Sequence, residues 1–386
     1  MTDIIIAGIG QIPVGEHWEL SLRSQAAKAM LAAVRDAGGI RPQALYIGNF
    51  LASVVSHQSN LGALLAENAG MTGIEAYTVE AAGASGAGAF RTGYLAVASG
   101  FVDAALVVGV EKYTDMVGAG LESAAAQAMD YDYEGVQGLS AVGQAGLLMQ
   151  RYLHEYQPPR SAFAAFPLLA HANAVNNPNA MFRKAIKPET YEKAGMVSAP
   201  LNLFDVAPLA DGAAAVLLTR ASLLPKDFPH PLVRVSGSSV VVDTLALHDR
   251  SDPLAFEAAR ISVEQACSQA GILPKDVNFF ELCDSTSIYA ALSLEAAGFA
   301  PRGEGWRLAA EGALNLGGKL PALTLGGLKA RGNPLGATGV YQIVEAVMQL
   351  RGQAGANQVA GAQRGLVQSL GGPASTAVTH VLERLG

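Results

Sequence analysis

Apolar residues along the chain fall into two alternating patterns. Continuous apolar runs, as in residues 4–10 and 104–110, are typical of strands buried on both faces of a sheet. Segments such as residues 21–37 instead carry apolar residues at helical spacing and end at glycines. This alternation predicts an α/β fold in which helices cover mixed sheets. Further strands are predicted at residues 45–48, 76–80, 213–218 and 277–282, and further helices at residues 83–99 and 256–270.

The alternation is interrupted in the middle of the chain. Residues 116–196 are rich in polar and aromatic residues, contain Pro158-Pro159 and an Asn-rich stretch, and lack strand signals typical of a sheet core. The sequence therefore predicts three parts. They are residues 1–115 together with 197–225 as a first half, residues 116–196 as an inserted loop domain, and residues 226–386 as a second half.

The second half repeats the order of signals in the first. One helix stops at Gly38 and another at Gly271, and each stop is followed by a proline and a strand. Later in each half a helix opens on a small-residue motif, at residues 83–86 and at residues 336–339. Chance similarity between Ala/Gly-rich helices is the alternative, but the shared order favours an internal duplication.

Composition narrows the possible functions. The 386 residues are 50% hydrophobic and 15% charged, with a net charge of −7 and 43 glycines. An acidic chain without Lys/Arg clusters argues against nucleic acid. No stretch of about 18 residues is uninterrupted and apolar, which argues against a membrane span. The few charges instead predict surface buried between subunits.

Cysteine and histidine usage excludes further classes. Two cysteines, Cys267 and Cys283, support neither a disulfide framework nor a four-thiolate zinc site, and the histidines show no metal-ligand spacing. Residues 1–4 show no secretory signal, so we expect a cytoplasmic protein without a metal.

Six motifs spread over nearly the whole chain carry a family resemblance. They are residues 8–10 (GIG), 79–86 (VEAAGASG), 171–178 (HANAVNNP), 211–215 (DGAAA), 326–339 (GGLKARGNPLGATG) and 371–372 (GG). In this order they resemble the thiolase superfamily, and most closely the non-decarboxylating thiolases of the archaeal and sterol-carrier-protein type. The resemblance implies duplicated βαβαβ-type halves that form a layered α-β-α-β-α core. It also implies an acyl-CoA (a coenzyme A thioester) as substrate, no permanently bound cofactor, and a homodimer or higher oligomer.

The positions that carry the family's chemistry are substituted. The thiolase nucleophile, a cysteine at a helix N-terminus, corresponds to Gly83, which cannot form an acyl-enzyme. The histidine that activates this cysteine corresponds to Asn333, which is not a general base near neutral pH. The second reactive cysteine of many relatives corresponds to Ser369, and a further polar position corresponds to Cys283. Four changes together imply that catalysis through a cysteine is lost.

Other parts of the family's site are retained. The backbone N–H groups of residue 83 and Gly371 correspond to the family's oxyanion hole, which survives the loss of side chains. Gly326 and Gly327 allow a pantetheine arm to approach the backbone closely. Lys329 and Arg331 either contact the phosphates of coenzyme A or are solvated residues near a glycine turn.

Several candidate residues keep two interpretations. Cys283 is either a displaced nucleophile or acid, or a small buried hydrophobe at a strand end. Asp284 either orients a group in the pocket or caps the helix that follows. His171 and Tyr341 are better explained by local structure and core packing than by catalysis.

Two functions remain open. The first is an enzyme that cleaves or forms a carbon–carbon bond beside a CoA thioester, for example by retro-aldol cleavage of a 3-hydroxyacyl-CoA. The tyrosines characteristic of thiolase-like aldolases correspond to Cys283 and the Asn333 region, so that pattern is not reproduced. The second is an inactive subunit that binds CoA or scaffolds an active thiolase or a small OB-fold/zinc-ribbon partner.

Overall fold

The computed structural model describes residues 3–386. Met1 and Thr2, two of the residues on which the prediction of no secretory signal rests, lie outside the described residues. One nine-stranded mixed sheet spans the molecule, in the order β3-β2-β4-β7-β1-β8-β11-β10-β9. Its strands are β1 (Ile4–Gln11), β2 (Ala44–Gly48), β3 (Glu75–Val79), β4 (Ala104–Glu111), β7 (Gly212–Arg220), β8 (Val233–Val242), β9 (Phe279–Glu281), β10 (Arg364–Gly371) and β11 (Thr376–Arg384).

Strand order confirms the expected thiolase fold with its two duplicated halves. Outward from the middle, the first half runs β1-β7-β4-β2-β3 and the second runs β8-β11-β10-β9. The halves join where β1 meets β8 at the pair Ile5 and Arg234. The second half has no counterpart of β3 as a full strand, and only an isolated parallel bridge, Phe280 with Ala322, stands in that place.

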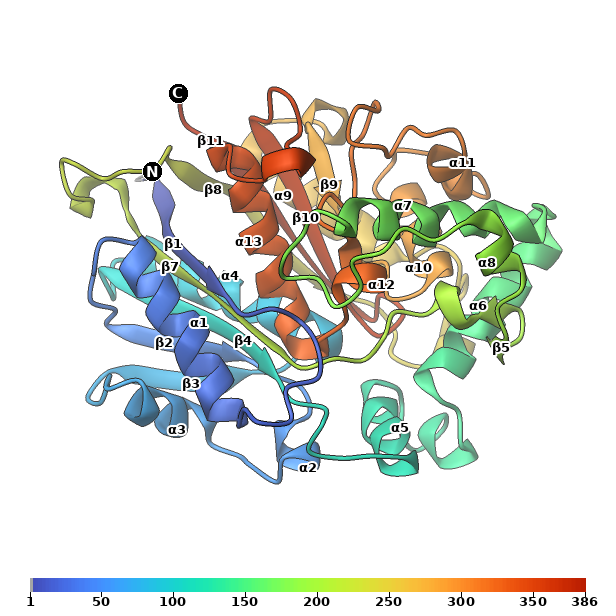
Figure 1. The fold of residues 1–386 in the computed structure, drawn as a ribbon, viewed down its shortest axis with the longest axis horizontal. Coiled ribbons are helices and arrows are strands. Elements are labelled where there is room, and N and C mark those ends of the chain that lie inside the picture. Colours follow the sequence, from blue (N-terminus) through green and yellow to red (C-terminus); the bar gives the residue numbers. More distant parts are fainter. Residues whose placement is uncertain (1–2) are drawn as a thin grey trace.

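Helices divide the fold into layers (Figure 1). The helices are α1 (Leu22–Asp36), α2 (Ala52–Val55), α3 (Leu61–Asn68), α4 (Ser85–Ala98), α5 (Ala119–Ala125), α6 (Ala141–Tyr156), α7 (Ala165–Ala174), α8 (Pro188–Glu192), α9 (Glu257–Ala270), α10 (Ser287–Ala296), α11 (Gly305–Ala310), α12 (Gly327–Arg331) and α13 (Thr338–Arg351). Helix α1 covers the outer face of the first half and α9 that of the second, while α4 and α13 lie between the halves. Helix α13 is almost fully buried and fills this central layer, with its polar residues Gln342, Glu345, Gln349 and Arg351 enclosed in the protein.

Close backbone contact explains several of the glycines in the central layer. A Cβ on Gly48 of β2 would lie 2.3 Å from the Cα of Gly86 in α4, so neither strand nor helix has room for a side chain there. The central helices therefore begin close to the strand ends, which places their first turns at the candidate site.

Between β4 and β7 the chain leaves the sheet. Residues 116–196 contribute no strand to the nine-stranded sheet; they form helices α5 to α8, and then the small hairpin of β5 (Met196–Ser198) and β6 (Leu201–Asn202) follows. Helices α6 and α7 pack against α10, α11 and α12 of the second half. The three-part division of the chain stays a prediction.

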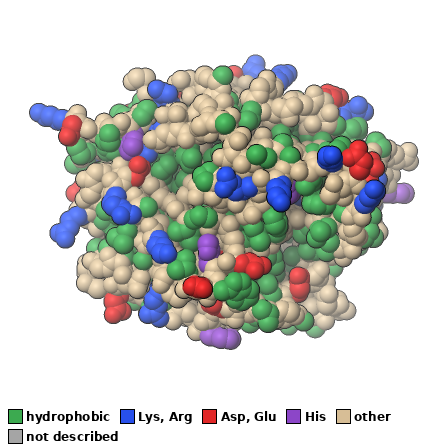
Figure 2. All heavy atoms as spheres, viewed as in Figure 1, with side chains coloured by type: hydrophobic (Ala, Val, Ile, Leu, Met, Phe, Trp, Pro, Cys, Tyr) green, Lys and Arg blue, Asp and Glu red, His purple; other side chains and the backbone are tan. Residues whose placement is uncertain are grey.

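Two expected elements are shorter than predicted. Strand β9 spans three residues rather than residues 277–282, and the glycine-rich helix begins at Ser85 because Ala82–Ala84 form a separate 3₁₀ turn. Figure 2 shows Lys and Arg side chains over α7 and α8 on one face of the molecule, with apolar atoms between them. Within residues 3–386, every helix is too short or too polar to span a bilayer.

Candidate functional site

An inner chamber of about 120 Å³ brings together the four substituted positions. Gly83 lies just before α4, Asn333 lies just before the 3₁₀ turn that leads into α13, Cys283 follows β9, and Ser369 lies on β10. The chamber therefore lies at the N-terminal ends of both central helices, where the helix dipoles favour negative charge. Its remaining walls are mostly apolar, and Gly371 itself is not among its lining residues although its neighbours Leu370 and Gly372 are.

Gly83 presents a free backbone donor. Its N–H makes no hydrogen bond to any residue within 3–386. The turn is held on both sides, because Glu80 Oε1 accepts from the N–H of Ala82 at 2.6 Å and the Ser85 hydroxyl donates to the Ala82 carbonyl at 2.6 Å. Ala82, directly before it, has a φ of +49° in the left-handed region, and Gly83 itself lines the chamber.

The space of the missing nucleophile is already filled. A Cβ built on Gly83 would lie 2.7 Å from the carbonyl oxygen of Leu370, well inside ordinary van der Waals contact. The obstacle is a backbone atom of β10, which moves less readily than a side chain. Glycine at position 83 is therefore a packing requirement of this chain as well as a chemical loss.

Asn333 is oriented as a hydrogen-bond donor. Its Oδ1 accepts from the Thr338 hydroxyl at 3.0 Å, and its backbone is clamped by the Pro208 carbonyl and the Ala210 N–H. Its Nδ2 donates to no acceptor in the described part of the chain, and the residue lines the chamber at 5% exposure. A fixed amide donor can bind an oxygen of a guest, but it cannot remove a proton.

Ser369 is not activated. Its hydroxyl donates to Gln342 Oε1 at 2.6 Å, and Gln342 Nε2 in turn donates to the Leu282 carbonyl at 2.9 Å. An amide oxygen is too weak a base to generate an alkoxide. Ser369 is therefore a polar wall of the chamber.

Cys283 is held as a neutral thiol. Burial raises the pKa of the Cys283 thiol, and its Sγ donates weakly to Ser285 Oγ at 3.7 Å. A thiolate rather than a thiol is the reactive form, so the environment disfavours a nucleophilic role near neutral pH. Cys267 is buried in the core, as the sequence indicated.

Sequence reasoning missed Tyr289. Its ring packs edge-on against Phe256 and its side chain lines the chamber. The signal was present: Thr286 is the N-cap of α10, which makes Tyr289 the third helical residue. Side chains of a first turn point back toward the helix N-terminus, here toward Cys283.

The predicted coenzyme A residues, Gly326, Gly327, Lys329 and Arg331, do not line the inner chamber. Gly326 and Gly327 have φ values of +109° and +51° and turn the chain into α12. The carboxylate of Asp284 accepts from the N–H groups of Leu328 and Lys329, so it caps α12 and not the helix that follows it in sequence, whose cap is Thr286.

Both basic side chains of this motif are buried. Lys329 donates to the Asp205 carbonyl at 2.6 Å, and burial lowers the pKa of its ammonium to about 8. Arg331 is fully buried, forms an ion pair with Glu345 at 3.3 Å and lies over the ring of Tyr341. Neither side chain is solvated, which differs from one of the two interpretations of the sequence. Because Arg331 is fully enclosed, a phosphate cannot reach its guanidinium in this conformation.

An outer cavity of about 480 Å³ adjoins the inner chamber, because the two share wall residues of α5, α6 and the loop at 206–209. Its walls are mainly apolar, with His171, Lys184 and Lys329 as its basic members. Burial lowers the pKa of His171, which stacks on Phe182 and contacts the Lys184 carbonyl through Nδ1 at 3.1 Å. His171 is therefore neutral at pH 7 and fixed by local structure.

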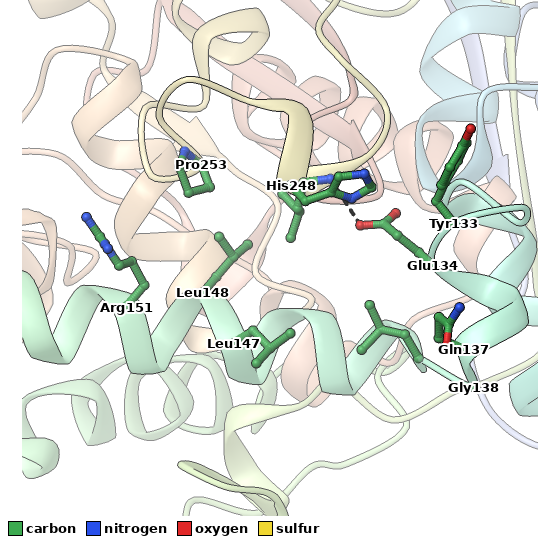
Figure 3. Close-up of a pocket in the computed structure, with 11 residues that line it drawn as sticks. Tyr133, Glu134, Gln137, Gly138, Leu147, Leu148, Arg151, His248 and Pro253 are labelled. Carbon is green, nitrogen blue, oxygen red and sulfur yellow. Dashed lines mark hydrogen bonds between the residues drawn. The ribbon is translucent and has the colours of Figure 1, made fainter.

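A third cavity, of about 620 Å³, opens on the surface between α6 and the loop near His248 (Figure 3). Glu134 at its base accepts from the Leu247 N–H at 3.0 Å and from Gln144, whose side chain also lines the inner chamber. Both carboxylate oxygens are thus used in structural hydrogen bonds. Among the described residues no group of three or more His, Cys, Asp or Glu side chains forms a metal site.

Comparison with known proteins gives one consistent result. Residues 4–222 match the family model described as Thiolase, N-terminal domain, and residues 239–384 match Thiolase C-terminal domain-like. The chain is 39% identical over 386 residues to an acetyl-CoA acetyltransferase of Methanothermobacter thermautotrophicus, with 100% of both chains covered. It is 30% identical over 241 residues to sterol carrier protein 2 of Bos taurus, which covers 61% of this chain and 44% of that protein. The solved structure named Ltp2-ChsH2(DUF35) aldolase has a TM-score of 0.85 at 25% identity, covering 99% of this chain and 98% of that one.

Proposed function

This chain belongs to the thiolase superfamily, in its sterol-carrier-protein type, and from that premise we propose that it binds an acyl-CoA and acts on a carbon–carbon bond beside the thioester. The observation that carries the proposal is the pair of free donors in the chamber, the Gly83 N–H and Asn333 Nδ2. The Gly83 N–H remains although position 83 has no nucleophile, and Asn333 supplies an amide donor at the position of the family's activating histidine. The likeness to a thiolase-fold aldolase supports chemistry without an acyl-enzyme.

The donors suit a retro-aldol cleavage of a 3-hydroxyacyl-CoA. When the bond between C2 and C3 breaks, its electron pair passes to the thioester carbonyl and forms an enolate, while the C3 hydroxyl gives its proton to a base and becomes a carbonyl. A proton returned to C2 of the enolate gives the shortened acyl-CoA, so the cleavage needs no oxidant or further reactant. Donors already aimed at the developing oxyanion stabilise this charge by about 3 kcal/mol each. We propose the Gly83 N–H and Asn333 Nδ2 as these donors; Gly371, expected as a further donor, does not line the chamber.

A second function is favoured by one specific observation. The two titratable side chains that line the chamber, Cys283 and Tyr289, both have a pKa raised by burial. Neither is therefore a ready base for the C3 hydroxyl near neutral pH. This favours the alternative of a subunit that binds CoA without turnover and supports an active thiolase or a small OB-fold/zinc-ribbon partner.

We propose the outer cavity as the path of the pantetheine arm. It is mainly apolar, it adjoins the chamber, and Lys184 lies exposed at its wall. The neighbouring side chains of Arg183 and Lys187 are exposed as well. Phosphates of coenzyme A would bind this exposed charge, while Lys329 is a buried member of the cavity wall.

Edge strand β3 is the proposed site of dimerisation. It pairs only with β2, so within residues 3–386 its outer edge has no partner strand. Tyr77 on this strand is 46% exposed, and such an edge is a template for pairing with a second copy. Sedimentation velocity compares the wild type with Thr78→Pro, which removes a backbone N–H donor from the edge strand and is expected to weaken the dimer. A variant that dimerises like the wild type, or a wild type that is monomeric, contradicts the proposal.

Binding and turnover are tested together. Isothermal titration of butyryl-CoA and 3-hydroxybutyryl-CoA into the chain, with and without a candidate OB-fold/zinc-ribbon partner, is followed by chromatography for cleavage products. Asn333→Ala is expected to weaken the complex by about 1–2 kcal/mol, the value of one buried hydrogen bond, while the exposed Asn315→Ala is the matched control. Binding without cleavage under both conditions refutes the enzyme and leaves the subunit; no binding refutes both.

A further inference from the structure

A buried lysine without a carboxylate partner lies in the wall of the outer cavity. The side chain of Lys329 is 2% exposed, and its ammonium makes one hydrogen bond, to the Asp205 carbonyl at 2.6 Å. An ammonium has three N–H donors, so two of them have no acceptor within residues 3–386. Burying a cation is unfavourable unless it is paired and hydrogen-bonded, so this lysine lacks an acceptor that its own chain does not supply.

The acids whose charge acts on Lys329 are engaged elsewhere. The Asp284 carboxylate accepts from two backbone N–H groups at the start of α12. The Asp205 carboxylate pairs with Arg160 and accepts from the hydroxyl of Tyr191. Both acids raise the pKa of Lys329 through space, but burial outweighs them and lowers it to about 8. The ammonium is therefore left without an ion pair in the described part of the chain.

The rest of the cavity wall favours an organic ligand over an inorganic ion. The cavity of about 480 Å³ is lined mainly by apolar side chains, among them Phe182 and Phe204. His171 in the same wall has a pKa lowered by burial and by the charge of Lys329, so it stays neutral. The acid of the lining, Glu122, belongs to α5 and is exposed. This wall complements an apolar body that carries one anionic group.

We propose that the outer cavity is a binding site for a small organic acid, with its carboxylate paired to the Lys329 ammonium and its hydrocarbon part against the apolar wall. The carboxylate takes the two free N–H donors, in charge-assisted hydrogen bonds that are stronger than neutral ones. Burial of the hydrocarbon part adds affinity in proportion to the apolar area removed from water. Because the outer cavity adjoins the inner chamber, a bound acid occupies the approach to it.

Isothermal titration of hexanoate and hexanamide tests the pairing, because the two ligands have the same shape and differ in charge. The wild type is expected to bind hexanoate about 10- to 100-fold more tightly, the range of a hydrogen bond to a charged group. Lys329→Met is expected to lose this preference, and Lys319→Met, at an exposed lysine, is expected to keep it. Inorganic phosphate buries no hydrocarbon and is expected to bind at least about 10-fold more weakly than hexanoate.

A second measurement needs no variant. An anion beside the ammonium raises the pKa of Lys329 above about 8, so the complex takes up protons at a pH where the free lysine is half deprotonated. Titration at about pH 8 in HEPES and in Tris, whose ionisation enthalpies differ, is expected to show uptake of up to about half a proton per hexanoate. His171 does not contribute, because its lowered pKa keeps it neutral at this pH.

The outcomes separate the parts of the proposal. Hexanamide bound as tightly as hexanoate, no proton uptake, or a preference that persists in Lys329→Met overturns the pairing with Lys329. Phosphate bound as tightly as hexanoate overturns an organic acid as the class of ligand, and failure of hexanoate to bind overturns the site as a whole. None of these ligands contains coenzyme A, so the proposed function is tested separately by its own titration.

Discussion

Adding a single methyl group at position 83 tests how the chamber has adapted to the missing nucleophile. In Gly83→Ala the new Cβ would lie 2.7 Å from the Leu370 carbonyl, about 0.7 Å inside ordinary contact. Such overpacking lowers the free energy of unfolding by about 1–3 kcal/mol. Replacing glycine also reduces the conformational freedom of the unfolded chain, which raises the same free energy by about 0.4–1 kcal/mol. The φ of Gly83 is not in the left-handed region, so the effect is steric. We expect a net destabilisation of about 0.5–2 kcal/mol.

Gly88→Ala is the matched control because Gly88 lies in the adjoining α4, where a Cβ would meet only a side-chain methyl of Val79 at 3.3 Å. Alanine is the better helix former there, so this variant is expected to gain up to about 1 kcal/mol. Urea unfolding followed by circular dichroism measures both variants against the wild type. If Gly83→Ala is at least as stable as Gly88→Ala, the Leu370 carbonyl does not fill the space of the nucleophile and the argument fails.

Three further variants or reactions test the buried groups around the site. Glu111→Gln is expected to lower the free energy of unfolding in urea by about 2–4 kcal/mol. The Glu111 side chain accepts from three backbone N–H groups and one side-chain amide, and the NH₂ group of glutamine would face two of these donors; a loss under about 1 kcal/mol contradicts this. Cys283 is expected to react slowly with iodoacetamide at pH 7 and faster as pH rises, since burial raises the pKa of the thiol; rapid modification at pH 7, located by mass spectrometry, would restore it as a nucleophile. Arg331→Met is expected to lower the free energy of unfolding by about 3–5 kcal/mol, because it leaves Glu345 unpaired. The double variant with Glu345→Leu is expected to recover part of this loss, and strictly additive effects would show that the pair is not coupled.

Much of the fold follows from local sequence. Continuous apolar runs predicted β1 and β4, because a strand buried on both faces needs no alternation. Glycines after helical stretches marked the ends of α1 and α9, as Gly271 at φ +69° illustrates. Strand β9 was predicted too long because its flanking residues are apolar for packing and not for pairing with a neighbouring strand.

The site was predictable only where a resemblance fixed the positions. Gly83 and Asn333 were assigned to one pocket from their places in motifs, and they do line one chamber. Tyr289 carries no such motif and was missed. Arg331 was expected near phosphate or in solvent, because sequence alone does not reveal that Glu345, one helix away, is its buried partner.

By itself the sequence determined an α/β duplication of thiolase type and the glycine at position 83, because apolar periodicity and residue identity are local properties. Only the tertiary structure decided which polar groups are free. Hydrogen-bond partners often come from other elements of the fold. Gln342 accepts from the Ser369 hydroxyl, the Thr338 hydroxyl donates to the Asn333 amide oxygen, and the Tyr289 hydroxyl has no hydrogen-bond partner among the described residues. Three-dimensional packing decides which partners are within reach, and it leaves the chamber around the four substituted positions with defined hydrogen-bond donors.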